Sequence, residues 1–165
     1  MASLPPLSPD IVDELNGLRG GFNEALGLRF THAGYDEVVG EVVLGPQHTQ
    51  PYGLVHGGVY AAMVETLASV GAALNLGAVG RHTVGLDNTT SFLKAVRTGT
   101  LVGTARPLSR GRRTQVWEVA ITAADELVAS GRVRLIAVDH GATVAGEVVD
   151  FKHPGTTVPE PAHEV

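Results

Sequence analysis

The strongest constraint on the fold is an apolar segment, residues 57–75, whose side chains recur at helical spacing. Two stripes run along this predicted helix. The larger side chains are Val59, Met63, Thr66, Leu67, Val70 and Leu74. The smaller ones, at spacings of four and three, are Ala61, Glu65, Ser69 and Ala72. Such a helix is expected to pack on a sheet with one side and to meet another subunit or a ligand with the other.

The segment before this helix has the composition of a binding turn. It reads Gln50-Pro-Tyr-Gly-Leu-Val-His56-Gly57-Gly58 and runs directly into the helix. A helix N-terminus offers unpaired N–H groups and a partial positive charge, and glycine lets a substrate atom approach the backbone closely. Donors of this kind at the helix start, with an acid further along, predict an acyl-transfer site.

Glu65 is the only acid within the predicted helix. Its sequence neighbours are small or apolar, and a buried carboxylate is costly unless it has a task or a partner, so a functional role is favoured over a solvated helix face. Ser69, one turn on, could hydrogen-bond Glu65 or simply bond back to a helix carbonyl. His56 is a candidate catalytic residue, although a histidine that braces the loop is the commoner arrangement. The spacing of His48, His56 and Glu65 matches no usual zinc pattern, so no metal is expected.

The N-terminal third of the chain predicts a helix and a hairpin. Ser8-Pro9-Asp10 has the pattern of a helix start, with Ser8 as N-cap and Pro9 at the first helical position. The glycine pair at 20–21 is expected to end that helix. Residues 28–35 and 37–44 are rich in strand-forming residues and predict a β-hairpin.

The segment after the long helix predicts consecutive strands. The four β-rich runs are 81–93, 99–109, 113–123 and 126–139. Short turns separate them, which favours an antiparallel meander, and Trp117 alternates with other apolar residues and is expected in the core. The whole order predicts an α+β fold with one helix laid across one sheet.

Composition argues against several classes of function. Without cysteine the chain has no disulfide, thiolate nucleophile or thiolate metal site, which is compatible with a reducing cytoplasm. A net charge of −5 and the lack of a basic stripe argue against nucleic-acid binding. The N-terminus lacks the pattern of a signal peptide, and the longest apolar segment, 59–74, is too short to cross a membrane. We therefore expect a cytoplasmic protein that does not enter the membrane.

The element order, with the pattern Gln50-x-x-Gly53-x-x-His56-Gly57-Gly58 and Glu65, resembles the hotdog-fold acyl-CoA thioesterases. Within them it looks most like the 4-hydroxybenzoyl-CoA thioesterases that carry a glutamate in the central helix, and their phenylacetate-pathway relatives. Two further segments are similar to that family's third strand and fifth-strand entrance, namely Asn88-Thr-Thr-Ser-Phe-Leu-Lys94 and Gly111-Arg112-Arg113-Thr114. The resemblance implies an antiparallel sheet wrapped around one long central helix.

This resemblance divides the chain into three parts. Residues 1–24 are expected to be a helical extension and residues 25–139 the hotdog domain. Residues 140–165, rich in glycine and proline, are expected to be a flexible tail.

The family implies a role for each residue of the site. Gly57 would donate its N–H to the thioester carbonyl, and Gln50 would assist that carbonyl or hold the attacking water. Glu65 would be a general base, or a nucleophile that forms a mixed anhydride. In the family these two ends of one site come from different subunits, which implies a homodimer or homotetramer.

The substrate implied by the family is an acyl-CoA, so coenzyme A is part of the substrate and no separate cofactor is expected. The residues that would meet its phosphates are Lys94, Arg112, Arg113 and Thr114. Many relatives carry Asn in place of Gln50 and Asp in place of Glu65, so this chain points to the aroyl-CoA branch and to an aromatic acyl group. Arg112 and Arg113 stand where that branch often has small hydroxylated residues.

Hydrolysis of an acyl-CoA to the free acid and coenzyme A is thus the predicted function, with two alternatives. A hotdog hydratase or dehydratase also uses an acid on this helix, but usually with a histidine around a Pro-Gly loop, which is not found here. A non-catalytic acyl-CoA-binding protein of the same fold would need a regulatory module, for which the segment before residue 25 is too short.

Overall fold

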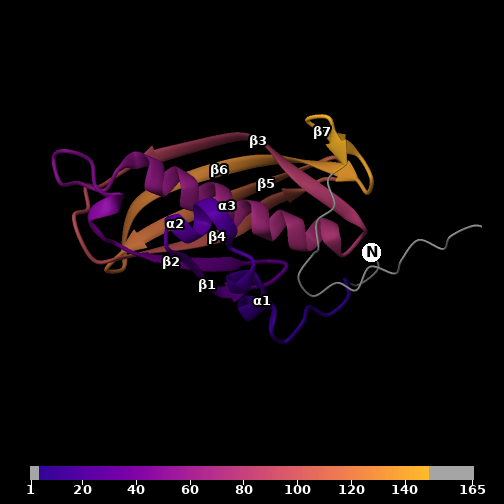
Figure 1. Cartoon of the computed structure of the whole chain (residues 1–165), viewed down its shortest axis with the longest axis horizontal. Coiled ribbons are helices and arrows are strands. Elements are labelled where there is room, and N and C mark those ends of the chain that lie inside the picture. Colours follow the sequence, from indigo (N-terminus) through magenta and orange to yellow (C-terminus); the bar gives the residue numbers. More distant parts are fainter. Residues whose placement is uncertain (1–3, 149–165) are drawn as a thin grey trace, which may run out of the picture.

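Figure 1 shows the computed structural model, which describes residues 4–148: one antiparallel sheet curls around one long helix. The helices are α1 (Ile11–Gly17), α2 (Gly20–Ala25) and α3 (Gly57–Gly77), with a 3-10 turn at Pro46–His48. The strands are β1 (Leu28–Ala33), β2 (Val38–Val43), β3 (Arg81–Phe92), β4 (Thr100–Arg110), β5 (Thr114–Ala123), β6 (Glu126–Asp139), β7 (Thr143–Val144) and β8 (Glu147–Val148). The predicted hairpin, long helix and four later strands are all present, so the α+β expectation is confirmed.

The order of the strands corrects the predicted meander. The main sheet has the order β1-β2-β4-β5-β6-β3, so only β4, β5 and β6 follow one another as a meander. Strand β3 instead pairs antiparallel with β6 at the far edge. The chain can reach that edge because α3 carries it along the sheet after β2, and because the loop 93–99 is long enough to return it to β4.

The N-terminal helix also begins later than predicted. Its N-cap is Asp10 and not Ser8, and Pro9 lies outside it. The Ser8 hydroxyl accepts a hydrogen bond from the Asp10 N–H (3.2 Å) and donates one to Glu14 (2.7 Å). The glycine pair does not end structure there, since α2 begins at Gly20 with a non-helical kink at Gly21.

The core is the layer between α3 and the concave face of the sheet. Met63 and Leu67 of α3 are fully buried against it, and Trp117 of β5 is fully buried as expected. Leu67 fits because two strands carry glycine beneath it: a Cβ added at Gly40 or Gly103 would lie 2.9 or 2.5 Å from its methyl groups. These close approaches bring the sheet onto the helix without a void.

The side of α3 away from the core is only half-buried. The half-buried residues there include Ala61, Glu65 and Ser69, as the small stripe predicts, together with Ala62, Thr66 and Val70. Ala72, assigned to the same stripe, is fully buried on the core side, so that assignment was wrong. One flank of the helix is therefore left for a ligand or for another chain.

Length and hydropathy alone would let α3 cross a membrane. It has 21 residues, longer than the segment 59–74 considered above, with a mean hydropathy of 1.4, and it is the one such helix in the described part of the chain. However, 67% of its most apolar window is buried inside the fold. The sheet covers the apolar surface of the helix, and an apolar helix of this kind is usual in the core of a globular protein.

The division into extension, domain and tail remains a prediction. The proposed boundary at residue 25 falls at the end of α2, and Ile11 and Leu15 of α1 belong to the same core as the sheet. Within the proposed tail, β7 and β8 form a short hairpin that the sequence did not predict, and the remainder of the tail lies outside the described residues.

We predict that Gly71→Ala lowers the free energy of unfolding by about 1–3 kcal/mol, the usual cost of overpacking a core. The new methyl carbon would lie 2.4 Å from the ring of Trp117, which is fully buried and has no room to move. Urea unfolding measures the change. The control is Gly17→Ala in α1, where no atom lies within 4 Å of the new carbon. Equal stability of the Gly71 variant and the wild type would contradict this account of the core.

Candidate active site

The loop that leads into α3 is braced by His48. Its side chain is buried, with 3% exposed. Nδ1 accepts a hydrogen bond from the Gly45 N–H (2.9 Å), and Nε2 lies 3.0 Å from the carbonyl oxygen of Leu26. The backbone N–H of His56 donates to the carbonyl of His48 (2.9 Å), which fixes the start of the helix to this buried point.

His56 is the N-cap of α3. Its Nδ1 accepts a hydrogen bond from the Gly58 N–H (2.9 Å), which satisfies one of the free donors at the helix start. This cap fixes the backbone where Gly57 begins the helix. The N–H of Gly57 has no acceptor within the helix. This geometry fits the bracing role weighed from the sequence, and a direct catalytic role for His56 remains a prediction.

A cavity of about 320 Å³ opens beside the start of the helix. Its lining residues are Gln50, Leu54, Val55, Gly57, Tyr60, Phe92, Leu93, Lys94 and Ala95. Three predicted site residues, Gln50, Gly57 and Lys94, therefore meet at one place. The Oε1 atom of Gln50 accepts from the Tyr52 N–H (2.7 Å), which ties this side chain to its own turn.

Glu65 lies two turns along the same helix, against the edge strand β3. Its Oε2 accepts a hydrogen bond from the side-chain amide of Asn88 (3.0 Å), which also donates to the Ala61 carbonyl (3.0 Å). Its Oε1 accepts a longer bond from Ser69 (3.4 Å), so the structure does bring these two predicted residues together. A Cβ added at Gly85, next to a bulge in β3, would lie 2.6 Å from Oε1. The carboxylate is thus held from both sides by donors and has a place made for it by glycine.

Within one chain the two halves of the predicted site are far apart. Gly57 and Glu65 are eight residues apart on one straight helix, about 12 Å at 1.5 Å per residue. A thioester carbonyl needs its polarising donor and the attacking group each within about 3–3.5 Å of the reacting atoms. This separation along the helix fits the expectation that each site draws on two chains.

The four residues expected to meet phosphates fall into two groups. Lys94 follows β3 at the end that carries the cavity and pairs with Glu126. Arg112, Arg113 and Thr114 lie at the opposite end of the sheet, where all three are exposed. A single chain does not bring the two groups together.

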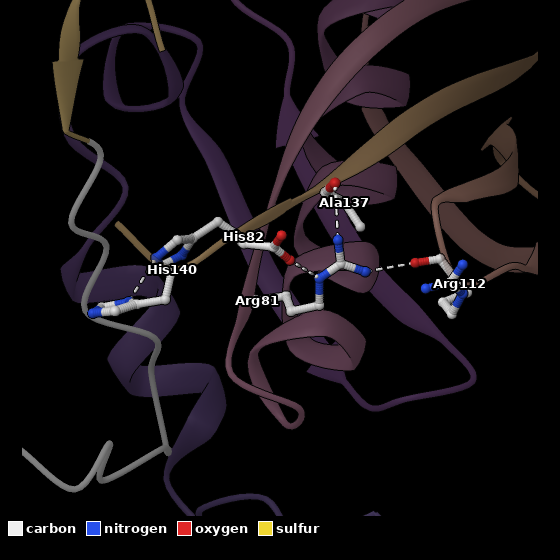
Figure 2. Close-up of polar contacts among 6 residues, drawn as sticks. Arg81, His82, Arg112, Ala137 and His140 are labelled. Atoms are coloured by element: carbon white, nitrogen blue, oxygen red, sulfur yellow. Dashed lines mark hydrogen bonds and ion pairs between the residues drawn. The ribbon is translucent and has the colours of Figure 1, made fainter. Parts of the chain in front are cut away.

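Figure 2 shows how the hairpin that carries these arginines is attached. The guanidinium of Arg81, at the start of β3, donates to the backbone carbonyl of Arg112 (2.6 Å) and to that of Ala137 (3.3 Å). It also pairs with Asp139 (2.8 Å). The side chain of Arg112 takes no part in these contacts, so it stays available at the surface.

Three residues near the site received no role from the sequence. Asn88 was noted only as part of a strand, because nothing local shows that this strand crosses α3 at Glu65. Tyr60 lies within the predicted helix, where no local signal sets it apart. Gly85 did carry a signal, since an isolated glycine within a strand pattern marks a bulge or a close backbone approach. No group of three or more metal-ligating side chains occurs within residues 4–148.

Comparison with known proteins settles the family. The model of the thioesterase superfamily matches residues 52–130, which include the helix and both groups of cations. Rv1847 of Mycobacterium tuberculosis, a predicted esterase, is 44% identical over 131 residues, which cover 78% of this chain and 93% of that protein. The chain belongs to the thioesterase superfamily.

Two further relatives carry thioesterase in their names. The proofreading thioesterase EntH of Cronobacter turicensis is 36% identical over 102 residues, 62% of this chain and 74% of that protein. The crystal structure of a thioesterase from Haemophilus influenzae superposes with a TM-score of 0.75 at 29% identity, covering 84% of this chain and 96% of that one. The hotdog fold is therefore confirmed, and the protein is a thioester hydrolase.

We predict that Gly85→Ala lowers kcat of thioester hydrolysis by about tenfold or more with little loss of stability. The added methyl would displace the Glu65 carboxylate, and small misplacements at a reacting centre cost up to about 100-fold in rate. The carboxylate is the mobile end of a long side chain, so the fold can absorb the shift. Thiol release measures the rate, and Gly34→Ala, which meets only ordinary contacts at 3.5 Å, is the control. An unchanged kcat in the Gly85 variant would show that the position of this carboxylate is unimportant.

Proposed function

We propose that the protein hydrolyses acyl-CoA thioesters, preferably of aromatic acids, at sites shared between two copies of the chain. The observation that carries this proposal is the pair of half-sites on α3. The helix start offers Gly57 beside a cavity, and Glu65 lies two turns further along, a helix rise of about 12 Å, with its carboxylate bonded to Asn88. A second copy of the chain can supply the half of each site that one chain lacks.

The proposed chemistry begins with a water molecule at Glu65. As general base, the carboxylate takes a proton while the water oxygen attacks the thioester carbon. Negative charge grows on the carbonyl oxygen, where the Gly57 N–H and the helix dipole stabilise it and Gln50 assists. The C–S bond then breaks, and coenzyme A leaves as a thiolate that receives the proton.

The second route makes Glu65 a nucleophile. Its carboxylate attacks the thioester carbon, coenzyme A leaves, and water hydrolyses the resulting mixed anhydride. Single turnover in ¹⁸O-labelled water, combined with trapping by hydroxylamine, separates the two routes. Label in the Glu65 carboxyl group, or a hydroxamate formed during turnover, indicates the anhydride, whereas label only in the product acid with no trapped hydroxamate supports the general base.

The edge strand and the uncovered helix flank support the proposed dimer. Within residues 4–148, strand β3 has no neighbour on its outer side, and a long open edge is unusual in a protein that stays monomeric. Leu86 and Phe92 of this strand are about half exposed, at 50% and 57%. Pairing of β3 with β3 of a second copy would cover this edge and would bring the Glu65 flank of each helix to the interface.

Antiparallel pairing of the two β3 strands would also bring Lys94 of one chain near the arginine turn of the other. In such a pair the Phe92 end of one strand lies beside the Arg81 end of the other. Because Arg81 holds the Arg112 turn, Lys94 would then share one end of the dimer with Arg112 of the partner subunit. This arrangement supports a role for Lys94, Arg112, Arg113 and Thr114 at the phosphates of coenzyme A.

We predict that Glu65→Gln lowers kcat by about 100-fold or more and changes KM much less, as expected when a general base or nucleophile is removed. The amide is the same size and can still bond to Asn88, so the fold should survive. Thiol release from benzoyl-CoA measures the rate, and circular dichroism checks folding. Near wild-type turnover by the folded variant would refute the role of Glu65.

Mixing two inactive variants tests the shared site. Glu65→Gln and Gly57→Val each damage every site of a homodimer, but a mixed dimer has one site with both groups intact. Random pairing should therefore restore about a quarter of wild-type activity, since half of the dimers are mixed and half of their sites are intact. No recovery in a mixture shown by sedimentation to contain mixed dimers, or an active monomer, would contradict the proposal.

A further inference from the structure

The hydroxyl of Tyr60 is a buried polar group without a partner. The side chain is 3% exposed, and within the described residues its oxygen is the one buried side-chain polar atom that makes no hydrogen bond. Leaving such a group unsatisfied is unfavourable by about 1–3 kcal/mol, so an unpaired hydroxyl in a native core calls for a partner from elsewhere.

The place of Tyr60 indicates where that partner comes from. Tyr60 lies one turn after Gly57 and lines the cavity at the helix start. Residues three apart share a face of a helix, and side chains lean toward its N-terminus, so the tyrosine ring leans toward Gly57. An acyl group whose carbonyl reaches the Gly57 N–H would therefore enter the cavity that Tyr60 lines.

The ring of Phe92 packs against both Tyr60 and Gly57. Its ring centroid lies 5.7 Å from that of Tyr60, and a Cβ on Gly57 would lie 2.6 Å from its ring atoms. Unlike Tyr60, Phe92 is 57% exposed at the end of the edge strand, so its ring can move without opening the core of its own chain. Rotation of this one ring would uncover Gly57 and the tyrosine together.

We propose that Tyr60 is a specificity-determining residue whose hydroxyl binds an oxygen substituent on an aromatic acyl group, with Phe92 packing on the ring. This proposal rests on the proposed function, because it places the thioester carbonyl at Gly57. The two aromatic side chains provide the flat apolar contact that a ring prefers. The volume of about 320 Å³ is near the lower limit for ligand pockets and suits a compact acyl group.

The protonation of Tyr60 fits this role. Burial raises the pKa of its phenol above the usual 10.0, so the group stays neutral and can donate a hydrogen bond at every pH where thioesters are assayed. A substrate without the substituent would leave the hydroxyl unpaired in the complex, and sites of this kind discriminate strongly against such analogues.

The experiment compares the wild type with Tyr60→Phe on benzoyl-CoA and on its 3-hydroxy and 4-hydroxy derivatives. The readout is the ratio of kcat/KM between the better hydroxylated ester and the unsubstituted one. We expect the wild type to prefer a hydroxylated ester and Tyr60→Phe to lower that ratio about tenfold, the usual worth of one neutral hydrogen bond. Tyr35→Phe is the matched control, since its hydroxyl donates to the Pro5 carbonyl (2.8 Å) far from the cavity, and it should leave the ratio unchanged.

The other sources of a partner predict different results. If a water molecule or a group of the second subunit satisfies Tyr60, the variant affects all three esters equally and the ratio stays constant. Either an equal effect or none overturns the proposal. Calorimetric titration with benzoate and its hydroxylated derivatives gives the same comparison without turnover, so the proposal stays testable even in an inactive protein. The proposed function fails separately, if the wild type releases no thiol or if Glu65→Gln retains full kcat.

Discussion

Burial of α3 by the curled sheet is the constraint on which the rest of the structure depends. A helix so apolar over 21 residues is stable in water only when other elements cover it. The glycines at positions 40, 71 and 103 make this possible because each lets a large side chain come close to the backbone. Their effect is to hold the helix at a fixed height and rotation over the strands.

That fixed rotation decides where chemistry can occur. Most of the surface of α3 lies in the core, so only its N-terminal end and one flank can present polar groups to a substrate. Gly57 occupies the end and Glu65 the flank, and the edge strand β3 lies beside both through Phe92 and Asn88. The helix keeps the backbones of these two residues about 12 Å apart along its axis, and the proposed sharing of the site between two chains rests on this separation.

Local patterns were enough to predict most elements, because helical spacing and strand alternation are properties of neighbouring residues. The long helix, the hairpin and Trp117 in the core could therefore be predicted, as could the meeting of Glu65 with Ser69. The position of β3 could not, because pairing with β6 is a long-range choice that short turns do not reveal. The same reason hid Asn88 as a partner of Glu65, and it hid the separation of Lys94 from Arg112 within one chain. Ser8 misled because it lies two residues ahead of the N-cap, where its hydroxyl bonds to the Asp10 N–H and to the Glu14 carboxylate and does not cap the helix.

The attachment of the Arg112 turn has a consequence for how this surface can change over time. Arg81 holds the turn through a backbone carbonyl, an atom that every amino acid possesses. The identity of the side chain at position 112 is therefore free to vary while the turn stays where it is. Residues of this turn, which we propose to meet the distal part of the substrate, can then be exchanged without disturbing the backbone contacts that hold the turn. Because the turn is held independently of its side chains, substrate specificity can change through single surface substitutions.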